Sequence, residues 1–186
     1  MTNFLTMRHE CRDFAQWKPV YDADAPNRAA AGLTDLLCMR GADNPNLVGL
    51  IFAVADVAKA KAMAGSPQLR EAMDRAGVVG APVATFRFGE YEAKAAAHYL
   101  TLYFKVSSFD TFMRGYAMDA ADRRAAGLTD LAVMQNAEDG HALFLLWAVA
   151  DVDKVKAFLA SPALAAHQVE HAGVISKPEA RFWTAA

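Results

Sequence analysis

The segment HQVEH at residues 167–171 has the spacing of a metal-binding motif. On a helix, His167 and His171 lie one turn apart, where two imidazoles can hold Zn²⁺ while Glu170 acts as a base. The segment nevertheless closes a predicted helix just before Gly173, a position where the helix dipole favours histidine. No obvious third ligand follows in the remaining fifteen residues, although one can come from elsewhere in the chain. We therefore predict no metal site.

His9 is the second histidine that could do chemistry. It follows Arg8 in a short segment whose residue types are typical of a strand. As a functional group it would be a general acid or base near neutral pH; as a core residue it would need one or two hydrogen-bond partners. The chain has no G-x-S-x-G elbow, no phosphate-binding G-x-x-x-x-G-K-[ST] loop and no G-x-G-x-x-G. Nucleophilic and nucleotide chemistry are therefore not indicated.

An internal repeat organises the elements that must position these residues. Shifting the chain by 95 residues places RAAAGLTDLLCM (28–39) on RRAAGLTDLAVM (123–134), and AVADVAKAKA (53–62) on AVADVDKVKA (148–157). From Leu5 to Leu69 this alignment has 28 identities over 65 positions without a gap. The chain is a tandem duplication of a unit of about 90 residues.

Each copy has the same predicted order of elements. Strands are expected where Val, Thr and aromatic residues are dense, and helices where aromatic residues recur at helical spacing. Gly32 and Gly127 are suited to the left-handed position that ends a helix. In the first copy we expect strands at 4–11, 33–40, 47–54 and 82–88. We expect helices at 14–31 and 56–77, the second of which pauses at Ser66-Pro67, where serine caps and proline takes the first helical position.

The resulting order βαββαβ is that of a ferredoxin-like unit. The fold class is therefore α+β, with two tandem ferredoxin-like repeats that form an intramolecular pseudo-dimeric α+β barrel, sheet against sheet. The predicted domains are repeat 1 at 1–89, a linker at 90–97 and repeat 2 at 98–186.

Composition excludes several classes of partner. The chain has 186 residues, a formal net charge of −2 and 54% hydrophobic residues, which is typical of globular proteins and unlike a nucleic-acid-binding domain. Its longest apolar runs, 47–55 and 142–150, are too short to cross a bilayer, and the N-terminus is not a secretory signal. Cys11 and Cys38 have no ligand spacing. We expect no nucleic-acid or membrane partner, a cytoplasmic location and possible self-association.

Three segments together resemble a known superfamily: DFAQWKPVYD (13–22), NRAAAGLTDLLCMRGADNPN (27–46) and SPQLREAMDRAGVVGAP (66–82). They are similar to small uncharacterised proteins of the dimeric α+β barrel superfamily, often described as resembling antibiotic biosynthesis monooxygenases or cyclases. Such proteins are usually one repeat long and pair into a barrel, so this chain resembles two members fused. Fused barrels that resemble chlorite dismutases hold haem through a helical histidine in their C-terminal half, but no wider motif here supports haem. We expect no cofactor.

The differences between the copies indicate where a site would lie. On the first strand Arg8 and His9 are replaced by Tyr103 and Phe104, and on the third strand Phe52 is replaced by Trp147. Alternation along the strand places His9 on the apolar face beneath the helices. We predict a mostly apolar ligand pocket between sheet and helices, with His9 as the candidate catalytic residue. The other predicted pocket residues are Arg8, Trp17, Tyr21, Phe52, Tyr103, Tyr116 and Trp147.

Two functions from different classes follow. The first is a cofactor-independent enzyme, monooxygenase-like or cyclase-like, acting on a small aromatic or polyketide-like compound. The second is a non-catalytic ligand-binding or stress-related barrel. An enzyme predicts an open cavity with polar lining in at least one copy, whereas a bland scaffold predicts that side chains fill both cavities. The aromatic residues Trp17 and Tyr21 also fit a helix face that is simply buried on the sheet.

Overall fold

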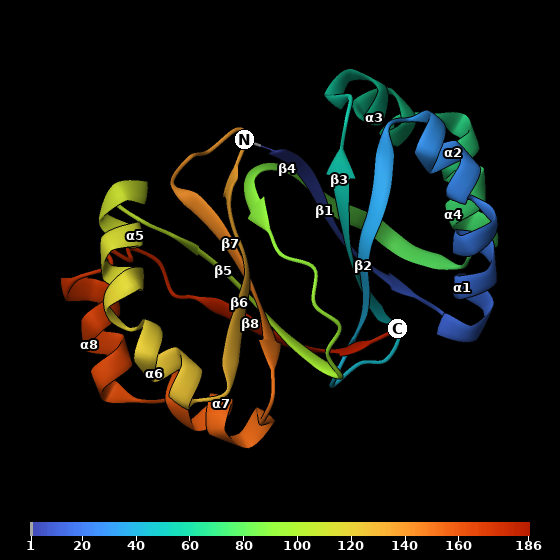
Figure 1. The fold of residues 1–186 in the computed structure, drawn as a ribbon. Helices are drawn as coiled ribbons and strands as arrows, with labels where there is room; N and C mark the ends of the chain where they lie inside the picture. The colour runs from blue at the N-terminus through green and yellow to red at the C-terminus, as the bar shows by residue number, and fades with distance from the viewer. Residues whose placement is uncertain (1) are drawn as a thin grey trace. The chain divides into compact units, whose positions relative to one another are not determined.

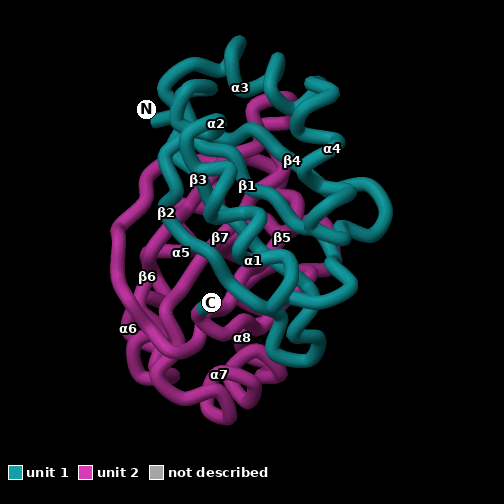
Figure 2. The backbone as a smooth tube through the Cα atoms, turned by 90° about the vertical axis from the view of Figure 1, so that its right-hand side faces the viewer, with its two compact units in different colours: residues 1–88, 186 teal, residues 89–185 magenta. Residues whose placement is uncertain are grey.

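The computed structural model describes residues 2–186, which divide into two compact units (Figures 1 and 2). Unit 1 comprises the residues up to Phe88 together with Ala186, and unit 2 comprises Gly89–Ala185. Both units follow one order: a strand, two helices, two strands, two helices and a last strand. The duplication seen in the sequence is thus a duplication of the fold.

Unit 1 is a four-stranded antiparallel sheet with four helices on one face (Figure 1). Its strands lie in the order β2-β3-β1-β4, so β1 is central beside β3. Its elements are β1 (Thr2–Cys11), α1 (Phe14–Ala23), α2 (Ala25–Ala30), β2 (Leu33–Gly41), β3 (Leu47–Val54), α3 (Val57–Ala64), α4 (Pro67–Arg75) and β4 (Val78–Tyr91).

Unit 2 repeats this arrangement with the strand order β6-β7-β5-β8. Its elements are β5 (His98–Lys105), α5 (Phe109–Met118), α6 (Ala120–Ala125), β6 (Leu128–Asn136), β7 (Ala142–Val149), α7 (Val152–Leu159), α8 (Pro162–Glu170) and β8 (Glu179–Ala185). The predicted α+β class and the two ferredoxin-like units are confirmed. The pairing of the two sheets into one barrel concerns the placement of the units and stays a prediction.

The helix ends follow from the capping residues. Asp56 accepts a hydrogen bond from the Lys59 backbone N–H at the start of α3, which satisfies one of the free donors of the first turn. Gly32 and Gly127 have φ of +75° and +89°, the left-handed conformation that the sequence predicted at these helix ends.

The single helix expected at 14–31 is wrong, because the structure has two helices that meet at Asp24. Pro26 alone does not explain the break, since unit 2 breaks at the matching Asp119 without a proline. Both units share an arginine that reaches back to the end of the first helix. Arg28 Nη1 donates to the Tyr21 carbonyl at 2.6 Å, and Arg123 repeats the contact in unit 2. This side-chain donor takes up a carbonyl near the end of the first helix.

The predicted linker at 90–97 overlaps the end of β4 and stays a prediction. β4 continues to Tyr91, and the following residues are held by unit 2. The Glu92 N–H donates to the Leu131 carbonyl at 2.7 Å, and the Ala96 N–H donates to Tyr99 Oη at 2.9 Å.

A β-bulge interrupts the second strand of each unit. The pairing of β2 with β3 shifts between Asp35 and Leu37, and that of β6 with β7 shifts between Asp130 and Ala132. Each bulge comes just after an aspartate whose cross-strand partner is Phe52 in unit 1 and Trp147 in unit 2. The bulge therefore sits beside one of the positions at which the copies differ.

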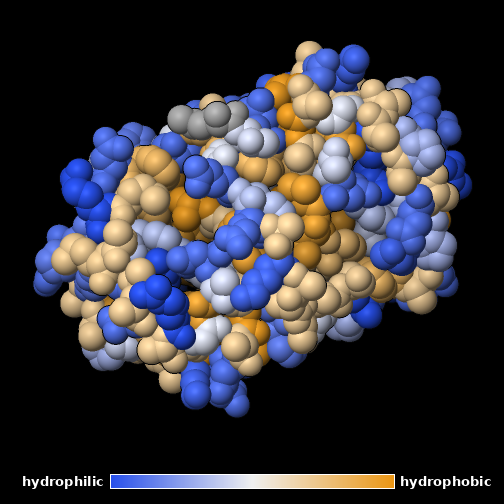
Figure 3. All heavy atoms as spheres, viewed as in Figure 1, coloured by the Kyte–Doolittle hydropathy of each residue, from blue (hydrophilic) through white to orange (hydrophobic). Residues whose placement is uncertain are grey.

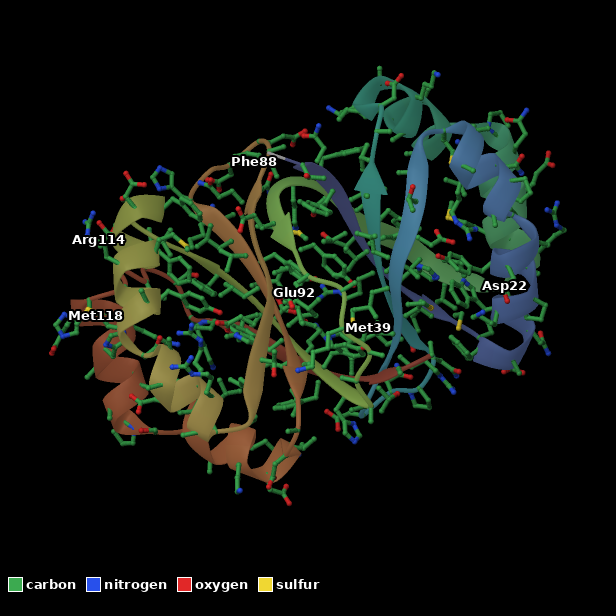
Figure 4. All side chains as sticks on the ribbon, in the orientation of Figure 1. Asp22, Met39, Phe88, Glu92, Arg114 and Met118 are labelled. Atoms are coloured by element: carbon green, nitrogen blue, oxygen red, sulfur yellow. The ribbon has the colours of Figure 1, made fainter. Side chains whose placement is uncertain are left out.

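Each unit buries an apolar core between its sheet and its helices. Leu5, Leu50 and Trp17 belong to this core in unit 1. Arg114 and Met118 on α5 extend away from the sheet (Figure 4), and hydrophilic and apolar side chains are mixed over the outer surface of the helices (Figure 3). None of the helices formed by residues 2–186 is both long and apolar enough to cross a membrane.

Candidate functional site

Each unit encloses a cavity between its sheet and its helices. The cavity of unit 1 measures about 80 Å³ and that of unit 2 about 40 Å³. On this measure a single water needs roughly 10–15 Å³, so the unit 1 cavity has room for several atoms of a small organic molecule. The larger cavity lies in the copy that carries His9.

An aromatic row forms one wall of the unit 1 cavity. Trp17 lies between His9 and Tyr21, with ring centroids 5.4 Å from His9 and 4.7 Å from Tyr21. β1 and β3 supply the floor through Leu5, Met7, Leu50 and Phe52, and α3 and α4 supply Met63, Leu69 and Met73. His9 reaches this wall because alternate residues of β1 face the helices.

His9 is the unusual residue of this lining. It is only 7% exposed, and neither ring nitrogen has a hydrogen-bond partner among the described residues. A buried polar group without a partner costs roughly 1–3 kcal/mol, so such groups call for a functional explanation. Burial also lowers the pKa of His9 to about 4, which keeps the imidazole neutral at pH 7.

An ion pair between a buried arginine and a half-exposed aspartate lies at the other end of the row. Arg28, 5% exposed, donates from Nε and Nη2 to the two carboxylate oxygens of Asp35 at 2.9 and 2.6 Å, and its guanidinium lies 3.8 Å above the Tyr21 ring. Burial alone would raise the pKa of Asp35, but hydrogen bonding and charge from Arg28 outweigh it and lower that pKa. Arg28 therefore clamps α2 to β2 and holds Tyr21 against Trp17.

Unit 2 contains the same cluster with one additional donor. Arg123 donates to both oxygens of Asp130 at 3.1 Å and lies 3.4 Å above the Tyr116 ring. Tyr116 Oη donates to Asp130 Oδ1 at 2.6 Å, and Trp147 Nε1 donates to Asp130 Oδ1 at 2.6 Å and to Tyr116 Oη at 2.9 Å. The indole thus completes a network that Phe52 cannot complete in unit 1.

Larger side chains fill the cavity of unit 2. His9, Phe52, Met63 and Ala72 of unit 1 align with Phe104, Trp147, Phe158 and His167 of unit 2. All four unit 2 residues line its smaller cavity. The difference in volume follows directly from these substitutions.

A glycine draws the helices of unit 2 together. A Cβ added to Gly115 on α5 would lie 2.6 Å from the Ala172 backbone just after α8, closer than real Cβ contacts. His167 Nε2 donates to the Gly115 carbonyl at 2.9 Å across the same contact. The matching residue of α1 is Val20, which lines the unit 1 cavity and keeps a side chain where unit 2 has none.

The structure brings most of the predicted pocket residues to the two cavities. His9, Trp17, Tyr21 and Phe52 line the first, and Tyr116 and Trp147 line the second. Arg8 and Tyr103 line neither, because each immediately precedes a residue that does and strand side chains alternate between faces.

The sequence also missed residues of the site. Reasoning from the sequence did not identify Val20, Ala72 or their counterparts Gly115 and His167 as determinants of cavity size. Comparing the aligned repeats for changes in side-chain volume would have found them.

His167 lies in the last turn of α8, and His171 directly follows that helix. Their rings lie 5.2 Å apart, and His167 is tied to the Gly115 carbonyl. Residues 2–186 contain no group of three or more His, Cys, Asp or Glu side chains placed to hold a metal. Both histidines also line a wider, open depression of about 690 Å³ between α6, α7 and α8.

No protein-family model and no curated protein matches the chain in sequence. Among solved structures, an anthrone oxidase-like protein matches with a TM-score of 0.66 at 8% identity, over 100% of this chain and 91% of its own. A protein from Lactobacillus acidophilus described as a candidate monooxygenase matches with a TM-score of 0.62 at 8% identity, over 99% of this chain and 94% of its own. A candidate chlorite dismutase matches with a TM-score of 0.57 at 9% identity, over 100% and 95%.

Identities this low demonstrate a shared fold and nothing more. The chain shares its α+β fold with these proteins.

Proposed function

We propose that the chain binds a small, mostly apolar compound in the cavity of unit 1 and acts on it without a cofactor, in a monooxygenase-like or cyclase-like reaction. The observation that carries the proposal is His9, a neutral and unpartnered imidazole on the wall of the larger cavity. The remaining lining is almost entirely apolar and aromatic, which suits a small aromatic or polyketide-like compound.

His9 would be both the polar contact and the base. Its nitrogens are buried at the cavity wall, so a modest turn of the ring presents one of them to the ligand. The neutral imidazole then accepts a proton from a carbon or oxygen that a neighbouring carbonyl acidifies. For anthrone, suggested by the name of one structural neighbour, loss of a methylene proton gives a carbanion that reacts with O₂. The net reaction of anthrone with O₂ yields anthraquinone and water.

Oxygen uptake with anthrone tests this role of His9. We expect turnover by the wild-type chain and a loss of roughly 10²-fold or more in His9→Phe, which installs the residue that unit 2 carries at this position. His167→Gln is the matched control, because it changes a histidine of the smaller cavity, and its rate should equal the wild-type rate. Equal rates for wild type and His9→Phe would remove His9 from the chemistry.

The pH profile provides a second test. Because the pKa of His9 is lowered to about 4, the imidazole is already in its basic form at pH 5. The acid limb of kcat/KM should therefore lie near pH 4 rather than near 6.5. A limb close to 6.5 would mean that the base is a different group or that His9 is hydrated.

A second candidate function is ligand binding without catalysis. Two observations favour it: an imidazole with a pKa near 4 is a weak proton acceptor, and Arg28, the strongest donor in the lining, is already engaged by Asp35. Saturable binding of a compound that copurifies, without oxygen uptake or any change in its mass, would select this function. Self-association stays a prediction that light scattering tests.

A further inference from the structure

The internal symmetry of the chain points to a second polar contact for the ligand of unit 1. We infer that Tyr21 Oη, beside the Arg28–Asp35 pair, forms a hydrogen-bond acceptor subsite for an N–H or O–H group carried by a flat ring compound. This inference rests on the proposed binding function and adds the class of ligand. The inference depends on one aligned position, which is Phe52 in the first repeat and Trp147 in the second.

The backbone positions of these two residues are equivalent. Phe52 is the cross-strand partner of Asp35, and Trp147 is the cross-strand partner of Asp130, in both cases next to the bulge. Cross-strand partners project on the same face of a sheet. A ring at either position therefore lies next to the aspartate.

In unit 2 the protein itself supplies the donor. Trp147 Nε1 lies 2.6 Å from Asp130 Oδ1 and 2.9 Å from Tyr116 Oη, so one N–H points at two acceptors. Arg123 and Tyr116 also donate to the same carboxylate. The Asp130 carboxylate thus accepts four hydrogen bonds, and the Tyr116 hydroxyl oxygen accepts one.

In unit 1 the acceptors remain and that donor is absent. Arg28 pairs with Asp35 as Arg123 pairs with Asp130, and Tyr21 holds the position of Tyr116. Phe52 has no N–H, and Tyr21, Phe52 and Arg28 all line the larger cavity. A ligand donor in this cavity can take the place that the indole N–H takes in unit 2.

Together with His9 this subsite defines the ligand more narrowly. The Trp17 ring separates the two polar positions, with His9 on one side and Tyr21 on the other. A flat ring that packs along this row would direct its donor to the Tyr21 end. The ligand is also not an anion, because the His9 imidazole is uncharged and Arg28 is faced by the carboxylates of both Asp24 and Asp35.

Indole and 1-methylindole are the probes that isolate the donor, since they differ by one methyl group on the ring nitrogen. Binding is followed by NMR of methyl-labelled methionine, because Met63 and Met73 line the unit 1 cavity and report its occupancy. We expect indole to bind about tenfold more tightly than 1-methylindole, the size of one hydrogen bond to a charged or shared acceptor.

Tyr21→Phe removes the hydroxyl and keeps the ring under Arg28. It should reduce the affinity for indole about tenfold and leave that for 1-methylindole unchanged. Tyr116→Phe makes the same change in unit 2 and should alter neither affinity. Phe52→Trp supplies the donor from the protein, as in unit 2, and should abolish indole binding while the chain stays folded.

The outcomes separate the subsite from the function on which it rests. If neither probe moves the Met63 and Met73 signals, the cavity does not bind ligands and both proposals fail. Equal binding of the two probes, or undiminished indole binding by Tyr21→Phe and Phe52→Trp, overturns the subsite and leaves the binding function standing.

Discussion

The two units share their ion pair and differ in the space beside it. Arg28 with Asp35 and Arg123 with Asp130 make the same hydrogen bonds, whereas the cavities measure about 80 and 40 Å³. Because a copy with little room keeps the pair intact, the pair is explained by its clamping of helix to strand. Ligand binding should therefore depend on the residues that differ between the units and enlarge the cavity of unit 1.

Among the changes that test this comparison, Gly115→Val should have the largest effect on stability. It gives α5 the residue of α1, but its Cβ would meet the Ala172 backbone at 2.6 Å, which the chain cannot relieve by turning a side chain. We expect a loss of about 3 kcal/mol or more in the free energy of unfolding. Urea titration followed by tryptophan fluorescence measures it, with the reverse change Val20→Gly as control. A loss below 1 kcal/mol would mean that the helices of unit 2 separate easily.

Acid should destabilise the chain through His9. Its pKa is about 4 when folded and about 6.5 when unfolded, so between these values the unfolded chain binds a proton that the folded chain does not. The free energy of unfolding should fall as the pH drops from 6.5 to 4, by up to about 3 kcal/mol.

The difference in stability between the wild type and His9→Phe isolates this effect, since the other titrating groups are common to both chains. As the pH drops from 6.5 to 4, the variant should gain stability relative to the wild type, and above pH 7 the difference between them should be constant. A difference that does not change from pH 7 to pH 4.5 would show that His9 takes up a proton as freely in the folded chain as in the unfolded one.

Removing either arginine tests whether the two clamps are equivalent. Arg28→Ala and Arg123→Ala should each cost roughly 2–3 kcal/mol, less than fully buried pairs because Asp35 and Asp130 are about half exposed. The loss in unit 2 should be the larger one. Trp147 and Tyr116 still donate to Asp130, but Arg123 also donates to Asp119, a carboxylate only 13% exposed, whereas Arg28 lies 4.0 Å from Asp24. Thermal unfolding of the two variants side by side ranks them, and the opposite order would mean that the donors left on Asp130 outweigh the loss at Asp119.

Trp147→Phe should have the smallest effect. It removes the shared indole N–H and part of a ring, but Asp130 keeps the bonds from Arg123 and Tyr116. We expect a cost of about 1–2 kcal/mol, together with a larger cavity in unit 2. Urea titration measures the cost, and binding of xenon observed by NMR detects the added space. Unchanged stability would mean that the indole bonds are no stronger than bonds to water.

The fold could be predicted from the sequence because the internal repeat and the residues that end helices are both visible in the sequence itself. Gly32, Gly127 and Asp56 mark helix ends by chemistry that does not depend on the rest of the chain. The break at Asp24 was missed because its common cause is a contact from Arg28 to a carbonyl seven residues earlier. The spacing of apolar residues along the sequence does not reveal such a contact.

The candidate site was predictable only in part. Alternation along β1 placed His9 towards the helices. The volume of a cavity depends on how several side chains from different elements meet, so Val20 and Ala72 gave no sign of their effect. That Trp147 donates to Asp130 depends on the register of β6 against β7, which the sequence did not reveal.

The bulge in β2 sets a limit on how this chain can change its length. Leu33 and Cys38 both face the helical core, although they are five positions apart, an odd number, along a strand whose side chains alternate. The extra residue at the bulge makes this possible. Deleting one residue there would turn the rest of β2 over and carry Cys38 out of the core, with buried Met39 taking its place. The same holds for Val133 in β6. Insertions and deletions should therefore be tolerated in the turns of either copy and excluded from the two bulges.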